Sequence, residues 1–183
     1  LLNLSPLAHP RFTFGEVLIM LAFVAEISLS VLLPLYFEGH AAATAMAAGA
    51  LMAGPVLADA AFAQLGGRLY DRFGVWPLVS SGFLFVAAGV IGVLFSPRAG
   101  APIALTAAIS AFTFVGIGFI VAPTKSTAME FLPTGLVSHG ASINSVLVQI
   151  AGSIGSAVFV GVMSAGILRD TASGMAKSAA HAA

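Results

Sequence analysis

The sequence consists largely of long apolar runs separated by short polar breaks. The runs lie at about 13–37, 41–66, 75–95, 102–124 and 140–168. A helix needs roughly 20 apolar residues to cross a bilayer, and each run reaches that length. The ten-residue alternating segments of a membrane β-barrel do not occur in the sequence. The pattern therefore predicts an all-α fold, a polytopic bundle of about five transmembrane helices.

Gly, Pro and charged residues gather in the breaks, where a helix has to stop. The breaks are 38–40, 67–74, 96–102 and 125–140, and residues 169–183 form a polar, alanine-rich tail. We therefore predict two parts, a transmembrane bundle over 1–168 and a tail over 169–183. Because the sequence begins at Leu1 without an initiator Met, we expect it to be a piece of a longer protein.

The densest charge lies in residues 67–74, Gly-Arg-Leu-Tyr-Asp-Arg-Phe-Gly, which we call the charged knot. Ionised groups are too costly for the bilayer interior, so we expect the knot to be a loop at the membrane face. Alternation of the spans then puts 125–139 on the same side and 38–41, 96–102 and 169–183 on the other. With the knot inside, four cations face the cytoplasm, Arg11, Arg68, Arg72 and Lys125, against three outside, Arg98, Arg169 and Lys177. This small excess favours a cytoplasmic knot.

Composition supports a membrane protein. The chain is 59% hydrophobic and 8% charged, whereas soluble domains carry roughly a quarter charged residues, and its mean hydropathy is +1.05. A net charge of zero makes a nucleic-acid partner very unlikely. The sequence has no cysteine, and its four histidines are scattered without metal-ligand spacing. It contains no phosphate-binding loop, HExxH motif or Ser/His/Asp constellation, so we predict neither an enzyme nor a metal or cofactor site.

The order of the residues within the knot is also informative. Gly67, Asp71, Arg72 and Gly74 are similar to the cytoplasmic loop motif of the major facilitator superfamily, in its second-half copy. Three further segments, at 33–37, 51–55 and 142–155, resemble segments of the same superfamily and occur in the same order. Over about residues 1–168 the chain thus resembles the C-terminal half of such a transporter, closest to the fourteen-span drug/proton antiporter branch. Residues 75–77, Val-Trp-Pro, lack the basic residues that often close the motif.

The resemblance implies five of the six helices of a half-transporter in the inner (plasma) membrane. The missing N-terminal bundle or a partner chain would complete it, and 169–183 would be an outside loop before the sixth helix. Two such bundles rock about a midplane site. The substrates would then be small amphipathic or cationic compounds, exchanged for protons.

Glu26 lies near the middle of the first predicted span, where an ionisable group costs roughly 2.5–3.5 kcal/mol. It is the first candidate for binding protons or a cationic substrate. The alternative is a structural carboxyl hydrogen-bonded to Ser28 or Ser30.

Asp59, in the second span, is the second candidate and follows a predicted Gly54-Pro55 hinge. Its alternative is a place near the inner face, where water reaches it.

Asn144 and Gln149, with Ser145 between them, come from one helix. They either line the cavity or form hydrogen bonds between helices.

The charged residues of the knot, Arg68, Asp71 and Arg72, are predicted to hold an inner gate, with Asp71 paired to an Arg across the loop. Alternatively they only direct insertion into the membrane. The leading interpretation is part of a proton-coupled drug exporter. The alternatives are a major facilitator metabolite carrier, and a non-transporting membrane structural or interaction protein, such as a split-gene half that needs a partner chain.

Overall fold

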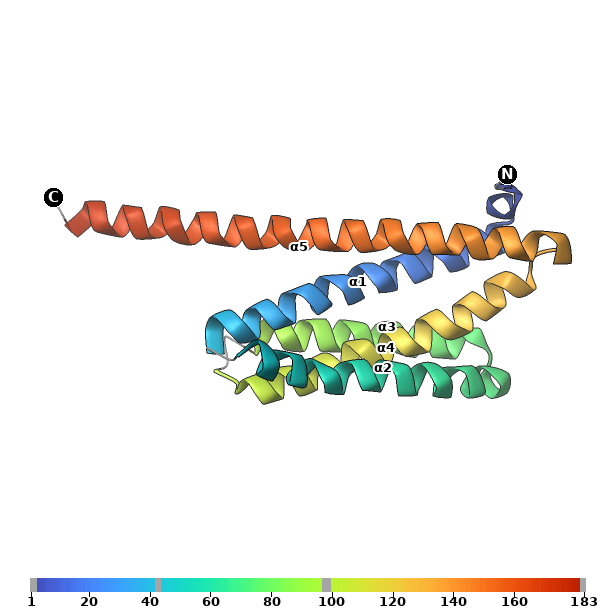
Figure 1. Cartoon of the computed structure of the whole chain (residues 1–183), viewed down its shortest axis with the longest axis horizontal. Helices are drawn as coiled ribbons and strands as arrows, with labels where there is room; N and C mark the ends of the chain where they lie inside the picture. Colours follow the sequence, from blue (N-terminus) through green and yellow to red (C-terminus); the bar gives the residue numbers. More distant parts are fainter. Residues whose placement is uncertain (1–2, 42–43, 97–99, 182–183) are drawn as a thin grey trace.

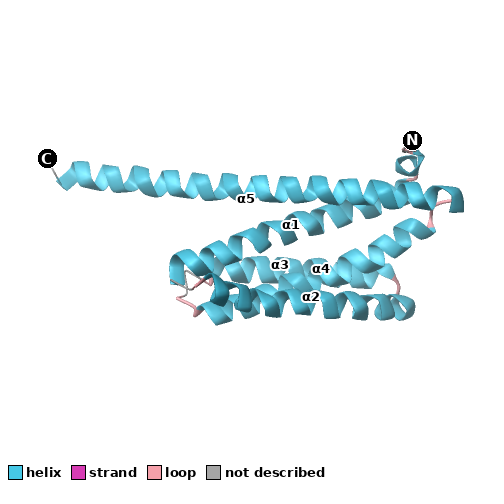
Figure 2. Ribbon diagram, viewed as in Figure 1, coloured by secondary structure: helices cyan, strands magenta, loops and turns pink. Residues whose placement is uncertain are grey.

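The computed structural model describes residues 3–41, 44–96 and 100–181. These residues form five long helices, α1 (Pro10–Ala41), α2 (Ala45–Phe73), α3 (Val75–Phe95), α4 (Ile103–Glu130) and α5 (Val137–His181). Two short 3-10 helices, η1 (Ser5–Ala8) and η2 (Thr134–Leu136), precede α1 and α5. No strand occurs in this part of the chain, so the predicted all-α class is confirmed (Figure 2).

Each of the five long helices in the described residues is long and apolar enough to cross a membrane. Successive helices run in opposite directions, and α5 extends well past the other four at its C-terminal end (Figure 1). α4 packs against α2, α3 and α1, while α5 packs mainly on α1. The chain is therefore a multi-pass membrane protein built around α4, with α5 held at one edge of the bundle.

Glycines let α4 approach its neighbours closely. A Cβ added to Gly116 would lie 2.5 Å from the carbonyl oxygen of Gly82, and one added to Gly118 would lie 2.8 Å from the backbone nitrogen of Ala63. Apolar helices gain little hydrophobic energy from each other in lipid, so such close packing supplies the contact. We call the joined faces of α2, α3 and α4 the glycine seam.

Not every small residue of the spans takes part in packing. A Cβ added to Gly49 or Gly54 of α2, or to Gly161 of α5, would meet nothing within 4 Å. Small residues thus mark a contact surface on some helix faces and leave others open.

The charged knot is not a loop, which corrects the sequence-based expectation. α2 continues through Gly67, Arg68, Asp71 and Arg72 and ends only at Phe73. Gly74 alone makes the turn into α3, with φ +78°, a backbone conformation that side chains with a Cβ disfavour. The helix continues because its last turns can leave the membrane and still be hydrated.

Other breaks also differ from the expected positions. α1 continues to Ala41, through the predicted break at 38–40, and α4 continues to Glu130. Residues 169–181 are helical as part of α5 and do not form the expected outside loop. Residues 42–43, 97–99 and 182–183, which belong to the segments predicted to face outward or directly follow one, lie outside the described residues.

Candidate functional site

Glu26 of α1 and Asp59 of α2 lie within range of a Coulomb interaction. Both side chains are half-buried. Neither makes a hydrogen bond or ion pair with another described residue, and the hydroxyl of Ser28 donates instead to the carbonyl oxygen of Gly155, at 3.0 Å. Two negative charges in a low-dielectric surrounding repel strongly. A proton or a cationic group between the carboxyls would relieve that repulsion.

The predicted hinge lies one turn before Asp59. Pro55 is inside α2 and buried, while Gly54 faces open space. Proline removes one backbone hydrogen bond from the helix. The local backbone next to Asp59 is therefore less constrained than elsewhere in α2.

Asn144 contacts an acid that the sequence analysis missed. Its side-chain Nδ2 donates a hydrogen bond of 2.8 Å to Oε2 of Glu16, and both residues are buried. Glu16 lies within the first predicted span, 13–37, so its position alone could have marked it as a candidate. Its partner was not predictable, because 128 residues separate the two in sequence.

Gln149 lies apart from Asn144. Its side chain is exposed and lines a shallow groove along α5 together with Ser145, Ser153 and apolar neighbours. The hydroxyls of these serines donate to backbone oxygens of their own helix, at 3.0 and 2.9 Å. The two polar candidates of α5 thus belong to different surroundings, Asn144 to a contact between helices and Gln149 to an open face.

The charged residues of the knot are exposed at the end of α2. Among the described residues, Arg68, Asp71 and Arg72 form no ion pair, contrary to the pairing expected for Asp71. The guanidinium of Arg72 instead lies 5.4 Å from the ring centre of Phe73. The end of α2 is linked to α4 by Tyr70, whose hydroxyl donates to Oε2 of Glu130 at 3.2 Å.

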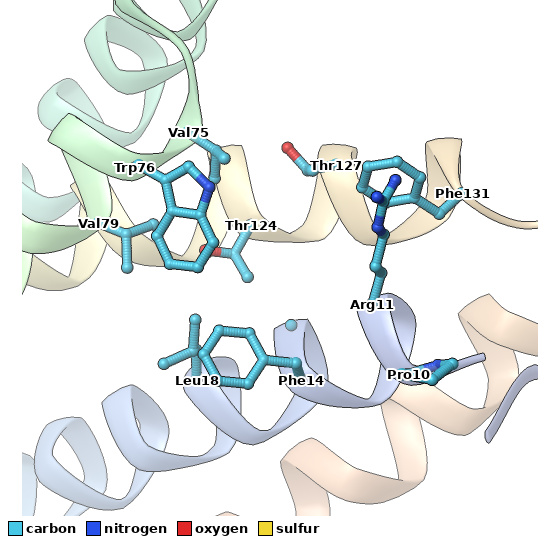
Figure 3. Close-up of a pocket in the computed structure, with 11 residues that line it drawn as sticks. Pro10, Arg11, Phe14, Leu18, Val75, Trp76, Val79, Thr124, Thr127 and Phe131 are labelled. Atoms are coloured by element: carbon cyan, nitrogen blue, oxygen red, sulfur yellow. The ribbon is translucent and has the colours of Figure 1, made fainter. Parts of the chain in front are cut away.

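A pocket of about 540 Å³ opens between α1, α3 and α4 at the same end of the bundle as the knot. Its walls are mainly apolar, and Phe14 and Trp76 face each other with ring centres 6.0 Å apart (Figure 3). At the mouth, the guanidinium of Arg11 lies 4.7 Å from the ring centre of Phe131. This pocket is separate from both acid sites.

The family assignment follows from comparison with known proteins. The model of the Major Facilitator Superfamily matches residues 2–156. The chain belongs to this superfamily. Its members are carriers and not enzymes, in agreement with the prediction from the sequence. No solved structure shows significant similarity to the chain.

Several relatives within the superfamily have informative names. The lincomycin resistance protein LmrB of Listeria innocua is 32% identical over 91% of this chain and 35% of that protein. LmrB of Bacillus subtilis is 28% identical over 91% of the chain and 34% of its own length. The riboflavin transporter RibZ of Clostridioides difficile is 23% identical over 86% of the chain and 34% of that protein. The chain thus spans about a third of the curated relatives that it matches.

Proposed function

We propose that the chain is part of a secondary transporter that exports small amphipathic or cationic compounds in exchange for protons. The N-terminal bundle, in the same polypeptide or in a partner chain, would supply the other cavity wall, and the two bundles would alternate access to a midplane site. Superfamily membership and the lincomycin resistance relatives support export of drug-like compounds.

The observation that carries the proposal is the pair of carboxyls between α1 and α2. An acid inside a membrane span is energetically costly and is a functional candidate by default, and here two such acids lie within Coulomb range of each other. The pair can hold a proton or a cation but has no basic partner among the described residues. This chemistry favours cationic over anionic substrates.

The distribution of cations supports a cytoplasmic face for the end of the bundle that holds the knot. The start of α1 and the ends of α2 and α4 lie at this end of the bundle (Figure 1). These segments carry Arg11, Arg68, Arg72 and Lys125. Lys and Arg collect on the cytoplasmic side of inner membranes. We therefore propose the plasma membrane as the location, with the knot and pocket inside.

Single-cysteine labelling from outside the cell tests this orientation, since the chain has no native cysteine. Gly39 and Gly135 lie near opposite membrane faces, and an added side chain at either meets nothing within 4 Å. A cysteine at 39 should react with an impermeant reagent in intact cells, and one at 135 only after permeabilisation. The reverse pattern would contradict the orientation.

Transport measured in vesicles with an imposed pH gradient tests the function. In a transporter expressed from its complete gene, Glu26→Gln should keep expression and folding but reduce gradient-driven lincomycin efflux to that of vesicles without the protein. Glu26→Asp should retain part of the activity, because the carboxyl survives on a shorter stem. Asp59→Asn tests the second carboxyl, and we expect it to weaken the gradient dependence too.

Glu38→Gln is the matched control, since Glu38 is an exposed carboxyl of the same helix. Its efflux should equal that of the wild type. Undiminished transport by Glu26→Gln would contradict the proposal and leave Glu26 with a structural role.

A metabolite carrier is the second candidate, and similarity to the riboflavin transporter RibZ favours it. Gradient-independent riboflavin movement by the wild type, without lincomycin efflux, would support this alternative. Movement of neither compound would favour a non-transporting membrane protein.

A further inference from the structure

Glu16 has an unusual place for a carboxyl group. Its side chain is 1% exposed, and Asn144, 3% exposed, donates to Oε2 across the contact between α1 and α5. The other oxygen, Oε1, is buried and has no hydrogen-bond partner among the described residues. One carboxyl oxygen of Glu16 therefore accepts a hydrogen bond and the other has no partner.

The charged groups around Glu16 do not complete the site. Lys125 of α4 is near enough for a Coulomb interaction but is exposed and forms no ion pair with Glu16 in the described structure. Arg11 of α1 lies over Phe131. On α5 the ionisable residue closest in sequence to Asn144 is His139, whose Nδ1 accepts a hydrogen bond from the backbone nitrogen of Asn3 at 3.4 Å.

A buried carboxylate with one hydrogen bond and no paired cation is costly, because its charge loses hydration without compensation. A protonated carboxyl in the same place leaves only a neutral hydroxyl without a partner, which costs less. If α1 and α5 separate, water reaches both carboxyl oxygens and the free-energy cost of the ionised form decreases. The closed contact thus favours a bound proton, and an open contact favours its release to water.

We infer that Glu16 is a second proton-binding site, positioned by Asn144, whose proton exchange is linked to closing and opening of the α1–α5 contact. The proton leaves the carboxyl for water at the nearby end of the bundle and returns when the helices close. Its use in driving transport rests on the proposed function, but proton binding itself does not.

The site is distinct from the Glu26–Asp59 pair. Glu26 lies within Coulomb range of an acid of α2, whereas Glu16 accepts a hydrogen bond from an amide of α5, and the two glutamates differ in burial. Glu16 and Glu26 thus lie on one helix, α1, in different surroundings. Glu16 is the closer of the two to the N-terminal end of that helix.

Infrared difference spectroscopy of the complete purified transporter in lipid tests the site. When pH is stepped, the carbonyl band of a protonated carboxyl should appear and disappear in the wild type. Glu16→Gln should remove one such band, since the amide keeps a carbonyl oxygen for Asn144 but cannot titrate. Glu26→Gln should remove a different band and leave the first.

If Glu16→Gln is recovered folded and every pH-dependent carboxyl band remains, the inference is wrong. If that variant does not fold, Glu16→Asp provides the test. A moved band in the Asp variant would support the site, and unmoved bands would overturn it.

The positioning role of Asn144 has its own readout. Asn144→Leu should change the pH at which the Glu16 band appears, whereas Asn144→Ser, which keeps a hydrogen-bond donor, should restore part of the wild-type behaviour. An unchanged pH dependence in Asn144→Leu would remove Asn144 from the proposal. A wild type that shows the Glu16 band but no gradient-driven efflux would refute the proposed function and leave the proton site intact.

Discussion

The glycine seam and the α1–α5 contact hold the molecule together in different ways. In the seam, backbone meets backbone: a Cβ added to Gly116 would lie 2.8 Å from the nitrogen of Val86 as well as close to Gly82. At the α1–α5 contact, side chains form two of the links, from Asn144 to Glu16 and from Ser28 to the carbonyl oxygen of Gly155. Among the described residues of this contact, backbones approach closely only around Gly155, whose added Cβ would lie 2.8 Å from the carbonyl oxygen of Val24.

The difference indicates which contact can change during function. Close-packed backbones cannot move apart by a small step without losing dispersion contacts. Side-chain hydrogen bonds can be exchanged for bonds to water when helices separate. We therefore expect α2, α3 and α4 to move as one body, and the end of the α1–α5 contact that holds Glu16 and Asn144 to be the adjustable part.

The largest expected effect comes from filling the glycine seam. Gly89→Val would drive its Cβ into Thr113, whose backbone nitrogen lies 2.6 Å from the added atom. α3 and α4 must then separate, and overpacking of this kind costs about 3 kcal/mol. We expect little monodisperse protein after detergent extraction and a lower melting temperature.

The control is Gly49→Val, at a helical glycine with open space around it. It should change the melting temperature much less. Equal decreases in melting temperature in both variants would show that the low helix propensity of valine, and not close packing in the glycine seam, causes the loss of stability.

An intermediate effect is expected where the α1–α5 contact is polar. Asn144→Leu leaves the buried Glu16 without its donor and should lower the free energy of unfolding by about 2 kcal/mol. Glu16→Leu combined with Asn144→Leu removes both polar groups and should recover most of that loss. The measurement is reversible unfolding in detergent, and a double variant less stable than Asn144→Leu would contradict the polar link.

The smallest effect is expected at the second link of the same contact. Ser28→Ala removes the 3.0 Å hydrogen bond to Gly155, and a bond of this type between membrane helices is worth about 0.6 kcal/mol. Ser30→Ala is the control, because the Ser30 hydroxyl makes no hydrogen bond within the described structure. If Ser28→Ala lowered the free energy of unfolding more than Asn144→Leu does, the Ser28–Gly155 hydrogen bond would be the stronger of the two links, contrary to this prediction.

Local information in the sequence was sufficient for the class of the protein. The long apolar runs require helices, since only a helix satisfies its own backbone hydrogen bonds inside lipid. The order of the residues in the knot identified the superfamily, and an acid within an apolar run marked Glu26 and Asp59 as candidates. These inferences depend on residues close together along the chain.

The tertiary structure decided helix ends and partners. The charge of the knot predicted a polar, exposed segment. It did not predict where α2 ends, at Phe73, because a helix can continue into water. Gly66, which precedes the knot, reads locally as a helix stop, yet its added Cβ would lie 3.2 Å from the carbonyl oxygen of Gly118, so it serves packing.

Only the folded chain shows that Glu26 lies within Coulomb range of Asp59, that Glu16 contacts Asn144 and that Gln149 contacts neither acid. Each of these contacts joins different helices, and their relative rotation follows from how the side chains and glycines of the whole bundle fit together. Hydrophobic pattern determines which segments enter the membrane, because transfer into lipid depends on each segment's own composition. It does not determine which polar groups meet there, because that depends on packing between segments distant in sequence.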